Sequence, residues 1–222
     1  MTLTFIDLYN ECAGQPWSMF DADAESADDL ESALKVSINK ATSYLWNLQP
    51  WSFRYETTTI KTRAGKNQYI LPEGTLTRKV ISGKVKYGVK YQGKSLEYIE
   101  DPEGLEQESG EPTSFYLVGE YLYLYPMPDN VYQVTLEYLL SPYGLNDEEE
   151  YLYEFKEEDD RLNIPDKYET MFKNCLISLA MMYAIADEND ENYSGYKKQY
   201  DDALIVLMKH CSDKLHNKRI TW

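Results

Sequence analysis

Apolar residues recur with helical spacing close to the start of the chain. Thr4, followed by Asp7 three residues later, resembles a capping box, in which each side chain bonds to the other residue's backbone N–H. Gly14 then provides a C-terminal stop. Between these signals, one apolar stripe is formed by Phe5, Leu8, Tyr9 and Cys12. The pattern predicts a short first helix.

A second, longer helix is predicted over residues 26–48. Ser26 and Asp29 supply its N-terminal capping signal, and it ends before Pro50, because the residue that precedes a proline disfavours helical geometry. Its apolar positions recur at i, i+3 or i+4, and i+7: Ala27, Leu30, Leu34, Ala41, Leu45 and Leu48.

Helical spacing returns in the last third of the chain. Ile164-Pro165-Asp166 predicts a helix start, since proline is preorganised for the first helical position and an acidic residue suits the positive end of the helix dipole. We expect this third helix to reach about Ala186. After a polar break at 187–192, a fourth helix is predicted over Tyr193–Leu215.

Between the two helical pairs, the apolar period changes to two residues, which is typical of β-strands. The clearest hairpin joins Ser114–Val118 to Tyr121–Tyr125, because Gly119 can take the positive φ that a two-residue turn requires. Further strands are predicted at Tyr55–Lys61, Gln68–Leu71, Val85–Tyr91, Ser95–Ile99 and Val131–Leu140.

The order of these elements predicts an α+β fold. The N- and C-terminal helices would form a four-helix bundle, with an antiparallel β-sandwich or barrel domain inserted between them. We expect the bundle to occupy residues 1–50 and 161–216, and the β-domain with an acidic loop to occupy residues 51–160. Residues 217–222 would form a C-terminal tail.

Acidic residues outnumber basic ones by 38 to 22, which gives a formal net charge of −16. This charge disfavours non-specific binding to nucleic acid. Residues 54–94 are nevertheless basic, whereas residues 95–160 contain a single basic residue, Lys156. The contrast predicts either internal complementarity or two faces for different neighbours. The densest acidic run, residues 146–160, is most simply a self-repelling loop with a short edge strand at Tyr151, Tyr153 and Phe155.

Few residues indicate catalysis or metal binding. His210 and His216 lack zinc-motif spacing, and a soft-metal site that combines them with Cys211 is disfavoured because adjacent helical residues point ~100° apart. The nucleophile-elbow, phosphate-loop and dinucleotide-binding motifs are absent from the sequence. We therefore predict no catalytic residue, no metal and no cofactor.

The cysteines and the N-terminal residues give information about the cellular compartment of the protein. Cys12, Cys175 and Cys211 are odd in number and lack motif spacing, and the first residues have no basic stretch before an apolar run. The longest nearly apolar stretch, residues 175–186, is much shorter than the ~20 residues of a membrane helix. These features predict a reduced, cytosolic chain without a signal peptide or a membrane span.

From the residues alone, three classes of function stay open. A structural protein is favoured by the lack of catalytic motifs and by the 21 tyrosines, which suit interfaces. A glycan hydrolase would use two of the many carboxylates, and a DNA-mimicking binding protein would use the acidic charge.

The order and spacing of several strings resemble the head-to-tail adaptor (connector) proteins of short-tailed bacteriophages. A long second helix is followed by Trp51-Ser52-Phe53, and then by a turn and a strand that ends at Pro72. The resemblance continues through a hairpin and the proline-led start of the third helix: Pro112–Tyr116, Gly119, Leu122–Asp129, Val134–Tyr138 and Ile164–Tyr168. It spans nearly the whole chain.

This resemblance implies a structural virion protein without enzymatic activity. Such an adaptor forms a ring, expected to be dodecameric, below the portal protein and joins it to a downstream tail or ring protein. Genomic DNA would pass through the central channel without specific binding. The resemblance also implies a place in the neck or tail of the virion, assembly in the host cytoplasm and no contact with membrane. In this setting, the hydrolase alternative becomes a tail-associated enzyme.

Two sets of residues are candidates for contacts. The chain ends in a short basic segment with a large aromatic residue, which we expect to contact the portal or a neighbouring subunit through Lys218, Arg219, Ile220 and Trp222. The second set is expected to join the domains: Trp51 and Phe53 as an aromatic wedge, and Pro126 and Pro128, which end the hairpin strand because proline cannot donate a ladder hydrogen bond.

Overall fold

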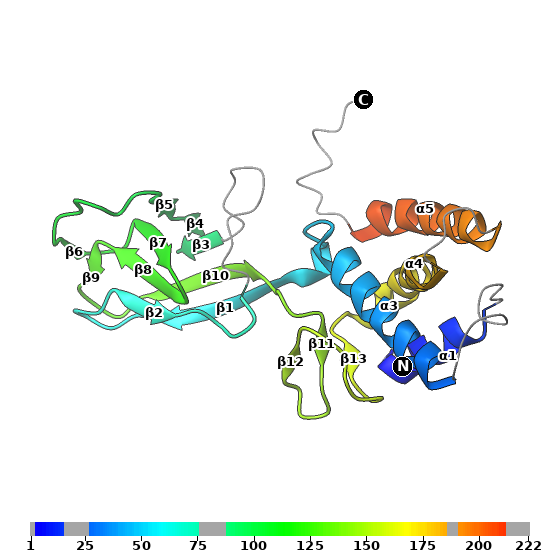
Figure 1. The fold of residues 1–222 in the computed structure, drawn as a ribbon. Helices are drawn as coiled ribbons and strands as arrows, with labels where there is room; N and C mark the ends of the chain where they lie inside the picture. Colours follow the sequence, from blue (N-terminus) through cyan, green and yellow to red (C-terminus); the bar gives the residue numbers. More distant parts are fainter. Residues whose placement is uncertain (1–2, 16–26, 76–87, 186–190, 212–222) are drawn as a thin grey trace. The chain divides into compact units, whose positions relative to one another are not determined.

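A computed structural model of the chain describes residues 3–15, 27–75, 88–185 and 191–211. The chain divides into two compact units. The helical unit comprises residues 1–54 and 142–222, and the strand unit comprises residues 55–141. The described residues form four α-helices and several mainly antiparallel sheets, so the predicted α+β class is confirmed (Figure 1).

The first helix, α1 (Phe5–Ala13), begins and ends where the sequence predicts. The Thr4 side chain accepts from the Asp7 backbone N–H, and the Asp7 carboxylate accepts from the Thr4 backbone N–H, which completes the capping box. Gly14 is the C-cap. The buried side of α1 carries Phe5, Leu8 and Cys12, as its apolar stripe predicts.

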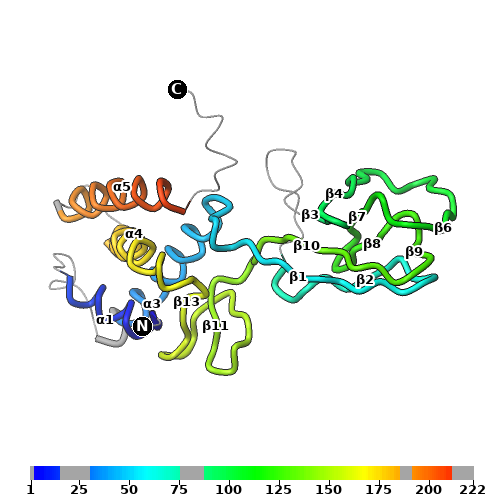
Figure 2. Tube along the Cα trace, turned by 180° about the vertical axis from the view of Figure 1, so that it is seen from behind, coloured from blue at the N-terminus to red at the C-terminus, as the bar shows by residue number. Residues whose placement is uncertain are grey.

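The remaining helices are α3 (Ala27–Asn47), α4 (Asp166–Ile185) and α5 (Glu191–Cys211). Helix α4 packs against both α3 and α5, and α1 packs against α3 and α4 (Figures 1 and 2). The position of α4 between its neighbours explains its sequence, because a helix that is covered on several sides is apolar around much of its circumference. Every residue of α4 from Cys175 to Met181 is buried.

The C-terminal end of α3 is capped by side chains that follow it in the sequence. The indole N–H of Trp51 donates to the carbonyl oxygen of Leu45 at 2.7 Å, and the Arg54 guanidinium donates to that of Trp46 at 2.6 Å. The short 3₁₀ helix η1 (Ser52–Arg54) brings Arg54 into this position. Two of the last carbonyl groups of α3 are thereby satisfied inside the core, and a cation lies at the negative end of the helix dipole.

An aromatic cluster connects this cap to α4. The Phe53 ring stacks on Trp51 with ring centroids 6.0 Å apart, and it meets Phe172 edge-on at 5.9 Å. Trp46 and Tyr168 complete the cluster at 5.6 Å and 5.5 Å from Phe53. The core of the helical unit thus joins residues that lie far apart in the chain.

The strand unit contains two four-stranded sheets. The first has the order β1 (Tyr55–Lys61), β10 (Gln133–Leu139), β3 (Gly88–Tyr91) and β4 (Lys94–Ser95). The second has the order β2 (Gln68–Ile70), β8 (Tyr121–Tyr125), β7 (Ser114–Val118) and β5 (Glu97–Tyr98). The β7–β8 hairpin has the predicted bounds and register, and Gly119 has a φ of 58°.

Two short strand pairs differ from the antiparallel prediction. Strand β5 pairs with β7 in parallel, as does β6 (Ser109–Gly110) with β9 (Met127–Pro128). The long connection between β5 and β7 allows this, because parallel neighbours need a crossover and cannot be joined by a tight turn. Part of the strand predicted at Val85–Tyr91 lies outside the described residues.

The acidic run, predicted as a self-repelling loop, is instead an ordered part of the helical unit. Strand β11 (Gly144–Leu145) pairs with β12 (Tyr151–Leu152) on one side and with β13 (Arg161–Leu162) on the other, so the edge strand predicted at Tyr151 is present. We call residues 142–162 the acidic lobe. Phe155, predicted on an edge strand, is buried in the helical core at 2% exposure. The helices supply an apolar surface on which Phe155 is buried, and this burial outweighs the repulsion between the carboxylates of the lobe.

Candidate docking site

The acidic lobe starts with a tight turn built on one side chain. The Asn146 Oδ1 accepts from the backbone N–H groups of Glu148 and Glu150 at 3.0 and 2.8 Å. Its Nδ2 donates to the Glu150 carboxylate at 2.9 Å. Asparagine commonly organises turns in this way, because its short side chain reaches the backbone two residues later. The turn holds a run of glutamates in one fixed conformation.

A second turn closes the lobe around Asp160. This residue is only 3% exposed, and its carboxylate accepts from the backbone N–H groups of Lys156 and Glu157 at 2.6 and 2.9 Å. A buried carboxylate needs such donors, because removing it from water without compensation is costly. Arg161 next to it forms an ion pair with Glu149 across the lobe.

One residue of α3 fastens the lobe to the helices. Asn39 Nδ2 donates to the carbonyl oxygen of Phe155 at 3.0 Å, and the Phe155 N–H donates to Asn39 Oδ1 at 2.8 Å. The Tyr143 hydroxyl donates to the same Oδ1 at 3.0 Å. The Phe155 ring packs between Phe5 and Tyr143, with centroids 5.4 and 5.1 Å away. Burial raises the pKa of the Tyr143 hydroxyl, which stays a donor.

The start of α1 also holds the acidic lobe against the helices. The N–H groups of Phe5 and Ile6 donate to the carbonyl oxygens of Asp160 and Glu158 at 2.7 and 3.0 Å. These two donors have no partner within the helix, so the lobe satisfies them. The positive end of the helix dipole also faces the most acidic segment of the chain.

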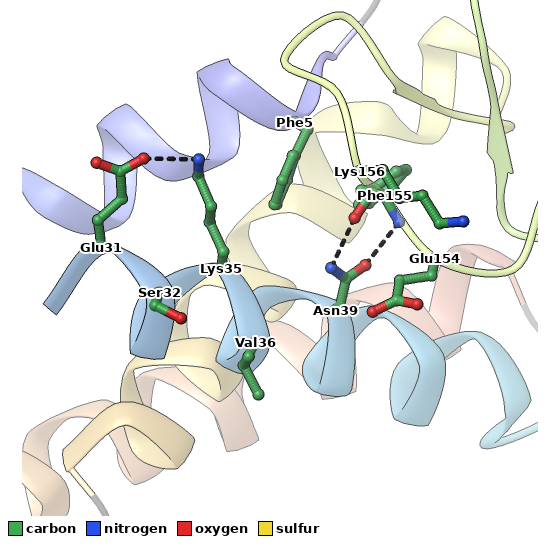
Figure 3. Close-up of a pocket in the computed structure, with 9 residues that line it drawn as sticks. All are labelled: Phe5, Glu31, Ser32, Lys35, Val36, Asn39, Glu154, Phe155 and Lys156. Carbon is green, nitrogen blue, oxygen red and sulfur yellow. Dashed lines mark hydrogen bonds and ion pairs between the residues drawn. The ribbon is translucent and has the colours of Figure 1, made fainter. Parts of the chain in front are cut away.

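Where the lobe meets α3, a pocket of about 430 Å³ opens between them (Figure 3). Its lining combines apolar and charged side chains from three segments: Phe5, Glu31, Ser32, Lys35, Val36, Asn39, Glu154, Phe155 and Lys156. Val36 is 63% exposed, which is unusual for a valine on a packed helix. Lys35 pairs with Glu31 at 2.6 Å, and the hydrogen bond from this pairing raises the pKa of Lys35.

The surface of the lobe is crowded with carboxylates. Eight acidic residues of the lobe are exposed: Asp147, Glu148, Glu149, Glu150, Glu154, Glu157, Glu158 and Asp159. Asp147 shares a hydrogen bond with Asp159, and this bond together with their mutual repulsion raises the pKa of Asp147. The lobe therefore presents a rigid acidic surface next to a partly apolar pocket, an arrangement suited to docking a basic partner.

The ionisable side chains that line the pocket are carboxylates and lysines, without histidine or cysteine: Glu31, Lys35, Glu154 and Lys156. In the described ranges, no three His, Cys, Asp or Glu side chains are grouped to hold a metal ion. Burial raises the pKa of Cys12 and Cys175 to about 12 and that of Cys211 to about 11, so all three thiols stay protonated at neutral pH. Among the described helices, none is long and apolar enough to cross a membrane.

The predicted contact residues fall in separate parts of the structure. Trp51 and Phe53 lie in the core of the helical unit, where Trp51 caps α3 and Phe53 packs on Phe172 of α4. Pro126 follows the last residue of β8, and Pro128 is a buried residue of β9. That these four residues join the two units stays a prediction. The predicted partner contacts at 218–222 lie outside the described residues.

The sequence patterns did not identify Asn39 or Asp160 as structural residues of a site. Asn39 lies in the middle of a predicted helix, where asparagine is unfavourable because its side chain competes for backbone hydrogen bonds. An asparagine at an unfavourable helical position was the sequence signal that could have identified Asn39. Asp160 gave none, because it ends a run of four consecutive acidic residues.

Most of the chain corresponds to a known family. A search among curated proteins found no match to the chain. The sequence profile described as SU10 adaptor protein matches residues 10–217, which include all the described helices except the first residues of α1, and the entire strand unit. The chain therefore belongs to the SU10 adaptor protein family and is a phage head-to-tail adaptor, a structural component of the virion.

Proposed function

We propose that this chain forms a ring below the portal protein and joins the portal to the next tail or ring protein. The family match over residues 10–217 is the observation that carries this proposal, because it covers both the helical and the strand units. In the proposed ring of twelve copies, the helices would act as a four-helix bundle and the strand unit as an inserted β-sandwich.

Genomic DNA would pass through the centre of this ring. A net charge of −16 supports such a channel, because an acidic wall repels phosphate and keeps DNA from adhering. Part of the acidity in residues 95–160 would face the channel or a basic neighbour. The basic segment 54–94 would meet an acidic surface. If so, ring formation becomes weaker at high salt, since ions screen exposed charges, and assembly that does not depend on salt would contradict this assignment.

The C-terminal residues would supply the contact with the portal or a neighbouring subunit. Lys218 and Arg219 provide charge, and Ile220 and Trp222 provide apolar anchors. Trp51, Phe53, Pro126 and Pro128 would set how the helical and strand units are joined.

The experiment is a binding titration of the full chain and of a chain that lacks residues 217–222 against the purified cognate portal protein. We expect saturable binding of the full chain and a loss of at least about tenfold in affinity on truncation, since a buried aromatic anchor commonly contributes 2 kcal/mol or more. Full affinity of the truncated chain would remove the role of the C-terminal residues. An absence of binding by the full chain would overturn the proposed function.

A further inference from the structure

Four tyrosines of the helical unit lie on helices α3, α4 and α5. Tyr44 lies on α3, Tyr183 on α4, and Tyr193 and Tyr200 on α5. Tyr44 is 48% exposed and the other three are half-buried. Their hydroxyls are close enough to influence one another: besides burial, Tyr44 and Tyr193 raise the pKa of Tyr183, and Tyr44 and Tyr183 contribute to the raised pKa of Tyr200.

Two lysines belong to the same surface. Lys40 of α3 lies over the ring of Tyr183, with its Nζ 4.1 Å from the ring centroid. Lys197 of α5 is exposed and follows Tyr193 by four residues and precedes Tyr200 by three, so the three residues share one side of the helix. We call these six residues the tyrosine face: Lys40, Tyr44, Tyr183, Tyr193, Lys197 and Tyr200.

The chemistry of the tyrosine face is that of a surface that binds carboxylates. Burial raises the pKa of the Tyr183 and Tyr200 hydroxyls, which stay protonated and donate hydrogen bonds, and the ammonium groups supply positive charge beside one carboxylate, that of Asp201, which acts on Tyr200. Tyrosine is also enriched in protein interfaces, because its ring contributes apolar area and loses little conformational entropy. The chain carries the complementary surface itself in the eight exposed carboxylates of the acidic lobe and in Tyr153, which is 62% exposed.

Within one chain, the lobe strands are separated from the α5 part of the tyrosine face. Figures 1 and 2 show the lobe strands β11 to β13 and helix α5 on opposite sides of α4. The lobe is also held in place by Asn39 and by the start of α1. Two different, complementary patches on separate sides of one subunit make a heterologous contact, which generates rings when the rotation closes.

We propose that the acidic lobe of one copy docks on the tyrosine face of the next copy, and that this contact links the subunits head to tail. The inference rests on the proposed ring, to which it adds the two surfaces in contact. Lobe carboxylates accept from the tyrosine hydroxyls and pair with Lys40 and Lys197. Tyr153 supplies an apolar side chain at the same contact.

The test is zero-length carbodiimide cross-linking of the unmodified chain, because this reagent joins a lysine to a carboxylate only where the two touch. Copies labelled with ¹⁵N are mixed with unlabelled copies, alone at high concentration and together with the cognate portal protein. We expect mixed-isotope cross-links between Lys40 or Lys197 and residues 147–159. Intermolecular cross-links confined to other surfaces, or none in either preparation, would overturn the inference.

Charge reversal supplies matched controls. Lys197→Glu should weaken association between copies by roughly tenfold, since like charges then oppose each other across the contact. Lys209→Glu, on another side of α5, should leave association unchanged. Combining Lys197→Glu with Glu148→Lys and Glu157→Lys should restore part of the loss. An equal effect of Lys197→Glu and Lys209→Glu, or no rescue, would contradict a contact at the tyrosine face.

Portal binding by the same variants separates the two proposals. If Lys197→Glu binds the portal normally as single copies but no longer forms the cross-link between Lys40 and the lobe, the portal contact stands and the contact between copies is the tyrosine face. If the unmodified chain binds the portal and forms rings without this cross-link, the inference fails while the proposed function survives. A failure of the unmodified chain to bind the portal defeats the proposed function itself.

Discussion

The helical unit and the strand unit are stabilised by contacts of different range along the chain. The core of the helical unit joins residues from the two ends of the sequence, such as Phe53 and Phe172. The strand unit is continuous in sequence, and its β7–β8 hairpin is closed by Gly119 and Glu120 alone. The helical unit can form only after its two parts meet across the inserted strands, so its folding carries the larger loop-closure cost.

The two units also expose different surfaces. In the strand unit, Ile70, Tyr121 and Val118 lie side by side across β2, β8 and β7, and they are 72%, 39% and 51% exposed. In the helical unit, the acidic lobe and the tyrosine face carry charges and hydroxyl groups, and Val36 on α3 and Ile205 and Val206 on α5 are also exposed. The exposed apolar side chains of the strand unit lie on paired neighbouring strands, whereas the helical unit combines exposed apolar side chains with the carboxylates of the lobe.

The largest effect is expected from Phe172→Ala in the centre of the helical core. Removing this fully buried ring should lower the free energy of unfolding of the helical unit by about 3–5 kcal/mol. The three cysteines all lie in the helical unit, so their reaction with a thiol reagent reports its opening. Tyr153→Ala, at an exposed position, is the control. Amide exchange measures the stability of the strand unit in the same variant. If Phe172→Ala destabilises the strand unit equally, the two units unfold as one.

A smaller effect is expected from Asn39→Ala. The change leaves the backbone N–H and carbonyl of Phe155 and the Tyr143 hydroxyl without their partner, at a cost of about 2 kcal/mol. Amide exchange at Phe155 should accelerate while exchange in the strand unit stays the same. Asn47→Ala is the matched control, because that side chain donates only to the Ser43 carbonyl on an exposed surface. Unchanged exchange at Phe155 would show that Asn39 does not fasten the lobe.

The start of α1 should respond to Thr4→Ala by about 1 kcal/mol, as expected for loss of an N-cap side chain. Chemical unfolding of the helical unit measures the loss. Thr4→Ser preserves the hydroxyl and should restore most of the stability. If Ser and Ala behave alike at this position, the capping box contributes nothing that the lobe carbonyls do not already supply.

The smallest expected effect is the titration of Asp147. Its pKa is raised from 3.8 by the hydrogen bond with Asp159 and by repulsion from it. Because folding raises this pKa, the protonated carboxyl stabilises the lobe below the ordinary value, and that contribution is lost as the pH rises through the raised value. Asp159→Asn removes the negative neighbour and should lower the pKa of Asp147, measured by NMR of its carboxyl carbon. A pKa that does not move would assign the shift to another cause.

Local signals in the sequence were sufficient for most elements. The Thr4 capping box, the Pro165 helix start and the Gly119 turn each act over a few residues, so the pattern predicted α1, the start of α4 and the β7–β8 hairpin. The parallel pairing of β5 with β7 escaped prediction, because strand pairing across a long connection has no local signal.

The acidic lobe shows why the candidate site was only partly predictable. Its charges were evident in the sequence, and they predicted a self-repelling loop. The contacts that hold the lobe in place against this repulsion come from residues far away in the sequence. Asn39 lies more than a hundred positions away from Phe155, and Phe5 packs on the Phe155 ring. A single sequence gives no indication of such pairs. Trp51 and Phe53 were named from the family resemblance as residues that join the domains, and the hydrogen bond from Trp51 to the end of α3 was not predicted.

Electron microscopy of the purified chain mixed with its cognate portal protein tests the proposed ring on the portal. We expect one ring of adaptor density coaxial with the portal, with each acidic lobe against the neighbouring α3–α5 surface and an open channel through the centre. Adaptor density that blocks the channel, or portal particles that carry no adaptor at saturating concentration, would contradict it.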